Sequence, residues 1–227
     1  NIAFSLDTPR MTIEEDMLTL DRVSLNATAN DIGGRAEING KLSAASGQAG
    51  VTRIASFGAT AQGPLSALAL TANVSGTRES FKSEAVSLEA AALYASARDR
   101  LTVSALAFSI GQSSMALAEP ATLDVSKGLS ISGASFDMKG PGGAGRTRAD
   151  FVLGARAVRL HLDTEHLPLE LVTPLFLSQA AHGTAAGKVD LDSAKGTGAA
   201  SLRFEGVRLA SADEREQPAF NATLDGS

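Results

Sequence analysis

The strict alternation of apolar and polar side chains in many short segments constrains this chain most. It is clearest in residues 158–163, where Val158, Leu160 and Leu162 alternate with three polar side chains. Successive side chains of a strand point to opposite faces, so a period of two predicts a strand with one buried face. The same pattern recurs in segments 2–6, 36–42, 68–74, 86–94 and 202–205. The sequence therefore predicts an all-β protein with about a dozen strands or more.

The connections between these segments are short and contain turn residues, such as Asn30-Asp31, Ser75-Gly76 and Asp99-Arg100. They leave no room for helical crossovers, so we expect neighbouring strands to pair mainly antiparallel. Residues 83–97 are rich in alanine, which favours a helix, but their period of about two favours a strand. At Asp21-Arg22 the apolar positions change parity, which predicts a β-bulge.

Several breaks in the pattern predict loops. Residues 43–50 are small and predict a loop, and Gly133 separates segments 129–131 and 136–138, which predicts two short strands there. The glycine-rich string 140–145 predicts a loose loop. We interpret residues 1–227 as one β segment of a longer chain, with a candidate sub-boundary near residues 140–147.

The one long apolar run, residues 167–177, contains Pro168 and Pro174. Proline fits the first turn of a helix but not its interior. Thr164 and Thr173 are candidate N-caps, which predicts one or two short helical turns packed against the apolar face of the sheet.

Each alternating strand has an apolar face that must be covered, and one short helix cannot cover a dozen strands. Either two sheets cover each other, or one sheet curls into an open apolar trough. Only 4% of the residues are aromatic, and many inward positions are Ala or Gly, which leave space where a packed core needs larger side chains. We therefore expect a long, curled, mainly antiparallel sheet that forms an open apolar groove, with one short helical plug.

No pattern indicates catalysis, a cofactor or a metal centre, so we predict no catalytic, cofactor-binding or metal-ligating residues. His161 lies on a polar strand face, Asp163 and His166 lack a third ligand at useful spacing, and His182 precedes Gly183 in an expected turn. Cysteine is absent, which excludes thiolate metal sites. The net charge is −5 with scattered Lys and Arg, which argues against nucleic acid as a partner. The acidic residues 14–16 predict a solvated turn.

The segment 162–209 carries a recognisable succession of motifs. It begins with Leu167-Pro168-Leu169 and the apolar run to Leu177. Gly183-Thr184-Ala185-Ala186-Gly187 then leads into an alternating strand, and Gly196 precedes the strand 200–205. This succession resembles the repeats of the TamB family, the inner-membrane subunit of the bacterial translocation and assembly module, within the AsmA-like group.

The resemblance implies a β-taco, which is a long antiparallel sheet curled around an apolar groove. It also implies a periplasmic location within an inner-membrane-anchored protein and contact with an Omp85-type outer-membrane barrel protein through regions outside these residues. The implied role is movement of phospholipid between the inner and outer membranes and support of outer-membrane biogenesis. The family has no catalytic residues to transfer to this chain.

The expected function is therefore a segment of a periplasm-spanning lipid conduit whose partners include phospholipid acyl chains. A secreted adhesin or autotransporter passenger with a closed β-helical or sandwich core is an alternative. A chaperone-like binder of outer-membrane protein strands through a sheet edge is another. The side chains expected to line the lipid groove are Ile38, Leu42, Leu70, Val74, Leu88, Leu160, Leu162, Leu202 and Phe204.

Overall fold

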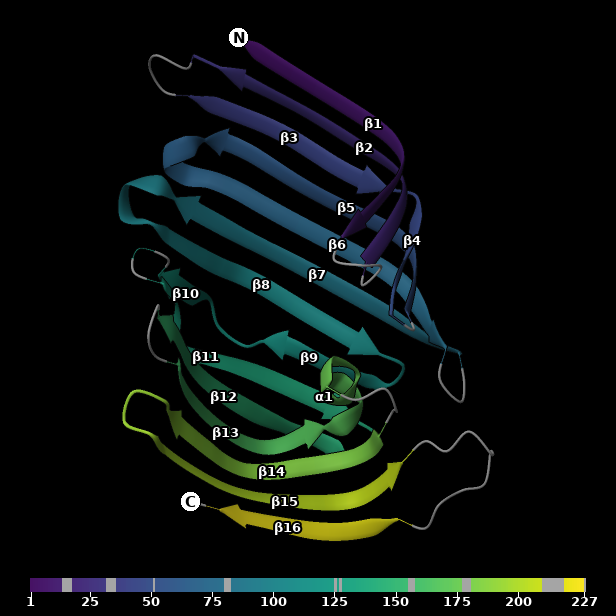
Figure 1. Cartoon of the computed structure of the whole chain (residues 1–227), viewed down its shortest axis with the longest axis vertical. Coiled ribbons are helices and arrows are strands. Elements are labelled where there is room, and N and C mark those ends of the chain that lie inside the picture. Colours follow the sequence, from purple (N-terminus) through teal and green to yellow (C-terminus); the bar gives the residue numbers. More distant parts are fainter. Residues whose placement is uncertain are drawn as a thin grey trace. The chain divides into compact units, whose positions relative to one another are not determined.

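The computed structural model confirms an all-β protein with a mainly antiparallel sheet and a single short α-helix among the described residues (Figure 1). The sheet contains 16 strands in the part of the chain that the structure describes. The chain divides into two compact units, residues 1–108 and 109–227, each described by itself below. The structure describes residues 1–13, 18–31, 36–50, 52–79, 83–124, 126, 128–154, 158–176, 181–209 and 219–226. The predicted acidic turn at 14–16 lies outside this set.

The first unit has strands that follow one another in the order β1-β2-β3-β5-β6-β7-β8, with β4 paired to β2 and β5. Short connections thus join neighbouring strands, as predicted, but the turn expected at Ser75-Gly76 was wrong, because both residues pair with β5 and β7 inside β6. The strands are β1 (Ile2–Ile13), β2 (Leu18–Asn30), β3 (Glu37–Ala44), β4 (Ser46–Ala49), β5 (Thr52–Pro64), β6 (Leu68–Glu79), β7 (Ser83–Ala95) and β8 (Arg100–Ile110), the last ending in the second unit. Two 3₁₀ turns connect consecutive strands: η1 (Leu65–Ala67) joins β5 to β6, and η2 (Ser96–Arg98) joins β7 to β8.

Two predictions in this unit have clear outcomes. Residues 83–95 form strand β7, which confirms the period of two over the alanine propensity. The predicted loop at 43–50 was wrong, because residues 46–49 form β4. Its backbone pairs with both β2 and β5, and those hydrogen bonds outweigh the turn preference of small residues.

The predicted β-bulge at Asp21-Arg22 was wrong, because the pairing of β1 with β2 keeps one register through it, but the change of parity is present. Arg22 has a positive φ of 53°, which turns the following side chains over without an extra residue. Leu20 and Val23 therefore point into the same buried cluster although their numbers differ in parity. Figure 1 shows β1 and β2 turning sharply partway along their length.

The second unit has strands in the order β10-β11-β12-β13-β14-β15-β16, with β9 also paired to β11. Its elements are β9 (Ser113–Leu117), β10 (Ala121–Asp124), β11 (Gly128–Gly140), β12 (Gly143–Gly154), β13 (Val158–Pro168), α1 (Leu169–Phe176), β14 (Ala181–Asp192), β15 (Thr197–Leu209) and β16 (Phe220–Gly226). The prediction of two short strands separated at Gly133 was wrong. Gly133 has a φ of 65° and sits at a register shift inside the single strand β11. The predicted loose loop at 140–145 was also wrong, because Gly140 pairs with Gly143 in the tight β11–β12 hairpin. The candidate sub-boundary at 140–147 falls on this hairpin within the second unit.

The predicted helical plug is α1, which follows directly on β13. Leu169 of the helix packs with Ala181, Ala185 and Val207 in a buried cluster that we call the plug cluster. Neither predicted N-cap begins this helix, because Thr173 lies within α1 and Thr164 lies before it. Thr164 lies within β13, where its buried hydroxyl hydrogen-bonds Oγ1 of Thr147 on the neighbouring strand at 2.6 Å.

Candidate apolar binding face

The five groove residues predicted in the first unit lie on one face of its sheet. Val74 of β6 pairs directly with Leu88 of β7, and Leu70 lies four residues before Val74 on the same strand. Ile38 and Leu42 of β3 lie on that face too, because Leu42 pairs with Ala59, whose partner on β6 is Ala72. All five are partly exposed, whereas the β6 residues of the other parity, such as Thr71 and Asn73, are exposed. We call this surface the first apolar face.

Small residues occupy the middle of the first apolar face. Leu70 lies in a cross-strand row with Gly40, Ala61 and Ala92, and Leu42 lies in a row with alanines. A Cβ added at Gly40 would lie 3.8 Å from the Cβ of Ala61, an ordinary contact distance, so the glycine leaves a shallow gap. Alternating large and very small side chains produce an uneven apolar surface that a flexible chain can fill.

One end of the first apolar face is closed by protein and the other is not. At the closed end, Leu20, Val23, Ala44 and Ile54 form a buried cluster in which Leu20 is only 2% exposed. On β1, beyond the bend, Phe4 belongs to one of the cross-strand rows that form this face. Its side chain is nevertheless 53% exposed. The described residues of this unit form strands of one sheet and two 3₁₀ turns, without an α-helix that could cover the face.

The second unit repeats this arrangement on a second apolar face. Leu160 pairs with Phe151 and Leu191, and Leu162 pairs with Ala149 and Val189. Leu202 lies opposite Gly187 and Leu224. These rows place Leu160, Leu162 and Leu202 on one face, all partly exposed.

Three of the predicted groove residues pack against buried clusters: Phe204 against the plug cluster, and Leu42 and Val74 against the cluster at the closed end of the first apolar face. The alternation of Leu202 and Phe204 correctly predicted that Phe204 lies on the apolar face. It did not predict that α1 packs over that position. Sequence reasoning also missed exposed apolar residues of this unit. Leu191 and Leu224 are 43% and 53% exposed, and the alternation in residues 220–224 could have indicated the second of them.

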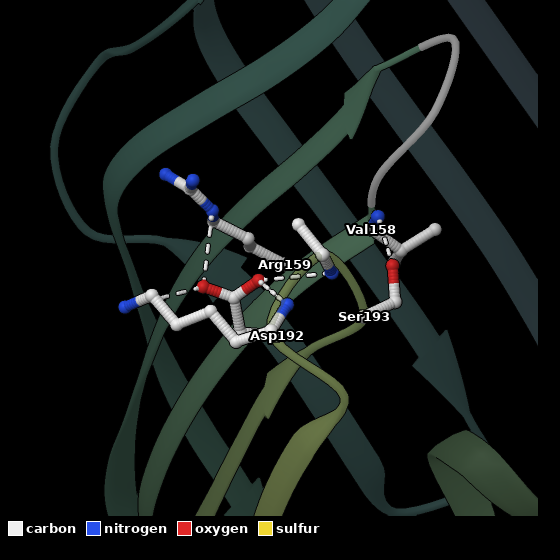
Figure 2. Close-up of polar contacts among 6 residues, drawn as sticks. Val158, Arg159, Asp192 and Ser193 are labelled. Atoms are coloured by element: carbon white, nitrogen blue, oxygen red, sulfur yellow. Dashed lines mark hydrogen bonds and ion pairs between the residues drawn. The ribbon is translucent and has the colours of Figure 1, made fainter.

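The opposite face of the second unit is polar, and several of its hydrogen bonds and ion pairs meet at Asp192 (Figure 2). One carboxylate oxygen accepts hydrogen bonds from the backbone N–H groups of Ala194 and Lys195, at 3.1 and 3.3 Å. The other lies 3.3 Å from Nε of Arg159. Beside it, the backbone N–H of Val158 donates to Oγ of Ser193 at 2.8 Å. These contacts fix the β14–β15 turn against β13, which is a structural role.

His161 lies on this polar face between two acidic residues of the flanking strands. Asp150 pairs with it on β12, and Asp190 pairs with it on β14. Nδ1 of His161 hydrogen-bonds the carboxylate of Asp190, and that bond, followed by the negative charge of Asp190, raises the pKa of His161 above its ordinary value of 6.5. An open hollow of about 420 Å³ lies beside the pair and is lined by both charged and apolar side chains.

We expect the pKa of His161, measured by NMR titration of the ring, to lie above 6.5 and to return toward 6.5 in Asp190→Asn. Because the folded-state pKa is the higher one, the stabilising contribution of the pair is complete below pH 6.5 and is lost as the pH rises through the folded-state value. The matched variant Asp150→Asn should change the pKa of His161 less. An unchanged pKa in Asp190→Asn would contradict this assignment.

The other candidate chemical residues are engaged in structural contacts. Asp163 forms an ion pair with Lys188 at 3.0 Å, while His166 packs against the glycines of the β11–β12 hairpin. Nδ1 of His182 lies 3.0 Å from the buried carboxylate of Glu170, so His182 links strand β14 to helix α1. In the described part of the chain, no group of three or more His, Asp or Glu residues could hold a metal ion.

Within the described ranges, no helix has both the length and the apolar character needed to cross a bilayer. Comparison with protein-family models, with curated proteins and with solved structures finds no match for this chain.

Proposed function

We propose that this chain is a segment of a periplasm-spanning lipid conduit that moves phospholipid between the inner and outer membranes and supports outer-membrane biogenesis. In this proposal acyl chains lie along the apolar face of each unit. The observation that carries it is the first apolar face, a continuous surface of partly exposed Leu, Ile and Val with Ala and Gly between them.

Leaving such an apolar face in water is unfavourable. Burial of apolar surface is favourable by about 25 cal/mol per Å², or about 0.8 kcal/mol per methylene group. A soluble protein rarely exposes a contiguous apolar patch of several hundred Å² unless something binds there. An acyl chain is a suitable occupant because its contacts are non-directional and it adapts to an uneven surface.

Two further points support this choice. The resemblance of residues 162–209 to TamB repeats indicates the same role, and with it the periplasmic location and the Omp85-type barrel partner. The pairings around both apolar faces are antiparallel, which favours the conduit over a β-helical passenger, whose strands would be parallel.

The double variant Leu70→Glu/Leu88→Glu tests the proposal, because it places two charges on adjacent strands of the first apolar face. We expect at least tenfold less phospholipid to co-purify with it, since a buried carboxylate next to an acyl chain is strongly unfavourable. The measurement is mass spectrometry of lipid extracted from purified protein. The control Ala69→Glu/Ala85→Glu adds the same charge to the same strands on the exposed face, and should retain lipid, as should changes at outward Lys41 and Arg203.

The remaining outcomes would contradict the proposal, and two of them would favour another function. Wild-type protein without any lipid would favour a passenger with a closed core. Equal lipid loss in both double variants would contradict the assignment of the face. Co-purification of outer-membrane protein segments in place of lipid would favour the chaperone-like reading.

A further inference from the structure

A buried arginine lies at the closed end of the first apolar face, one row beyond the buried Ile54. Arg78 is in phase with Leu70 and Val74 on β6, and its side chain is 2% exposed. Its Nε and Nη1 atoms are buried and have no hydrogen-bond partner among the residues that the structure describes. The other side chains in this phase of β6, from Leu68 to Val74, are apolar. Arg78 is therefore a charged group on a surface that otherwise suits hydrocarbon.

Within the described ranges, no acidic side chain of the neighbouring strands forms an ion pair with Arg78. Glu84 lies directly opposite Arg78 on β7, yet the two form no ion pair. By contrast, Arg10 of β1 is exposed and pairs with Asp21 at 2.9 Å. A guanidinium stays protonated at any physiological pH and carries five N–H donors, so burying it without a partner is strongly unfavourable. An anion that accepts two of those donors at once would relieve that cost.

We propose that Arg78 binds a phosphate group, and that this phosphate belongs to the phospholipid whose acyl chain lies along the first apolar face. This inference rests on the proposed conduit function and assigns the lipid a polar anchor. Thr52 lies directly opposite Arg78 on β5 and carries a hydroxyl donor on the same face of the sheet. Strand β6 would then bind both the phosphate and the acyl chain.

The dimensions of β6 fit such a ligand. A strand rises about 3.3 Å per residue, so the eight residues from Arg78 to Leu70 span about 26 Å. The hydrocarbon core of a bilayer is about 30 Å thick and holds two leaflets, which gives about 15 Å for one acyl layer. Val74 lies four residues, or about 13 Å, from Arg78, so a phospholipid with its phosphate at Arg78 can keep its acyl chain on Val74, whereas Leu70 lies beyond the length of one acyl layer. Because Arg78 is nearly inaccessible, we expect uptake to need local opening at this end of the strand.

Binding of three probes to delipidated protein tests the proposal: phosphatidylglycerol, diacylglycerol with the same acyl chains, and inorganic phosphate. We expect wild-type protein to bind phosphatidylglycerol at least tenfold more tightly than diacylglycerol. Arg78→Gln should remove that difference and leave diacylglycerol binding unchanged, while Arg78→Lys should keep part of it. Lys41→Gln, which removes an exposed charge on the opposite face, is the matched control and should bind like wild type.

The failures are distinguishable. Absence of binding of both lipids to wild-type protein overturns the conduit, whereas equal binding of both lipids, unaffected by Arg78→Gln, overturns only the role of Arg78. Inorganic phosphate that binds wild type but not Arg78→Gln, without a preference for phosphatidylglycerol, assigns the site to free phosphate and overturns the lipid anchor. Thermal unfolding of the delipidated protein adds a second readout. Arg78→Gln should melt no lower than wild type, and a lower melting temperature would assign Arg78 to a structural ion pair instead.

Discussion

Replacing Gly187 with alanine is expected to lower the free energy of unfolding of the second unit by about 2–4 kcal/mol. Gly187 has a φ of +136°, a conformation that costs an alanine backbone strain. A Cβ there would also lie against the backbone carbonyl oxygen of Ser201 on β15, which cannot move without breaking the β14–β15 pairing. Denaturant unfolding of purified Gly187→Ala against wild type measures the effect.

Gly196→Ala separates the two causes. Gly196 has a φ of +63°, but nothing lies within 4 Å of a Cβ added there. This variant should therefore show only the conformational cost of a left-handed residue, about 1 kcal/mol. Equal losses of stability in the two variants would contradict the close approach of β14 and β15 at Gly187.

Replacing Leu20 with alanine is expected to cost about 2–5 kcal/mol of stability in the first unit, the range for a fully buried leucine. Leu20 is 2% exposed and packs with Val23, Ala44 and Ile54, so its removal leaves a cavity at the closed end of the first apolar face. Leu6 is the matched control, because it has the same side chain on β1 and is 46% exposed. Leu6→Ala should cost less than about 1 kcal/mol in delipidated protein.

These two leucines test how the face is covered. A large loss in Leu20→Ala with a small one in Leu6→Ala means that protein packs over one end only. If Leu6→Ala destabilises the delipidated protein as much as Leu20→Ala does, protein covers the face near β1 as well. That result would remove the space in which we place the acyl chain.

Alternation predicted the fold class well because it is a local property that strand geometry converts directly into two faces. The pattern in β6 and β7 correctly placed Leu70, Val74 and Leu88 on one surface, since direct cross-strand pairs share a face. The short helix was also predictable, because the apolar run at 167–177 lacks any alternation, but its bounds were not, since Pro168 ends β13 and Pro174 lies inside α1.

Features that depend on pairing between distant residues were not predictable. Gly133 looks like a strand break in sequence, yet it is a bulge because β12 keeps pairing on both sides of it. Thr164 looks like a helix cap, yet Thr147 of β12 holds it in a strand. Arg78 ends an alternating pattern as any solvated arginine could, and only the three-dimensional packing at the strand end buries it.

The central claim is that acyl chains contact one face of the sheet and not the other. Photo-crosslinking tests it most directly: protein loaded with a phospholipid that carries a diazirine in its acyl chain is irradiated, and the labelled residues of β6 are mapped by mass spectrometry. The account predicts labels at Leu70, Ala72 and Val74, the partly exposed phase, with few at Thr71, Asn73 and Ser75. Labels spread equally over both phases, or absent from β6, would contradict it.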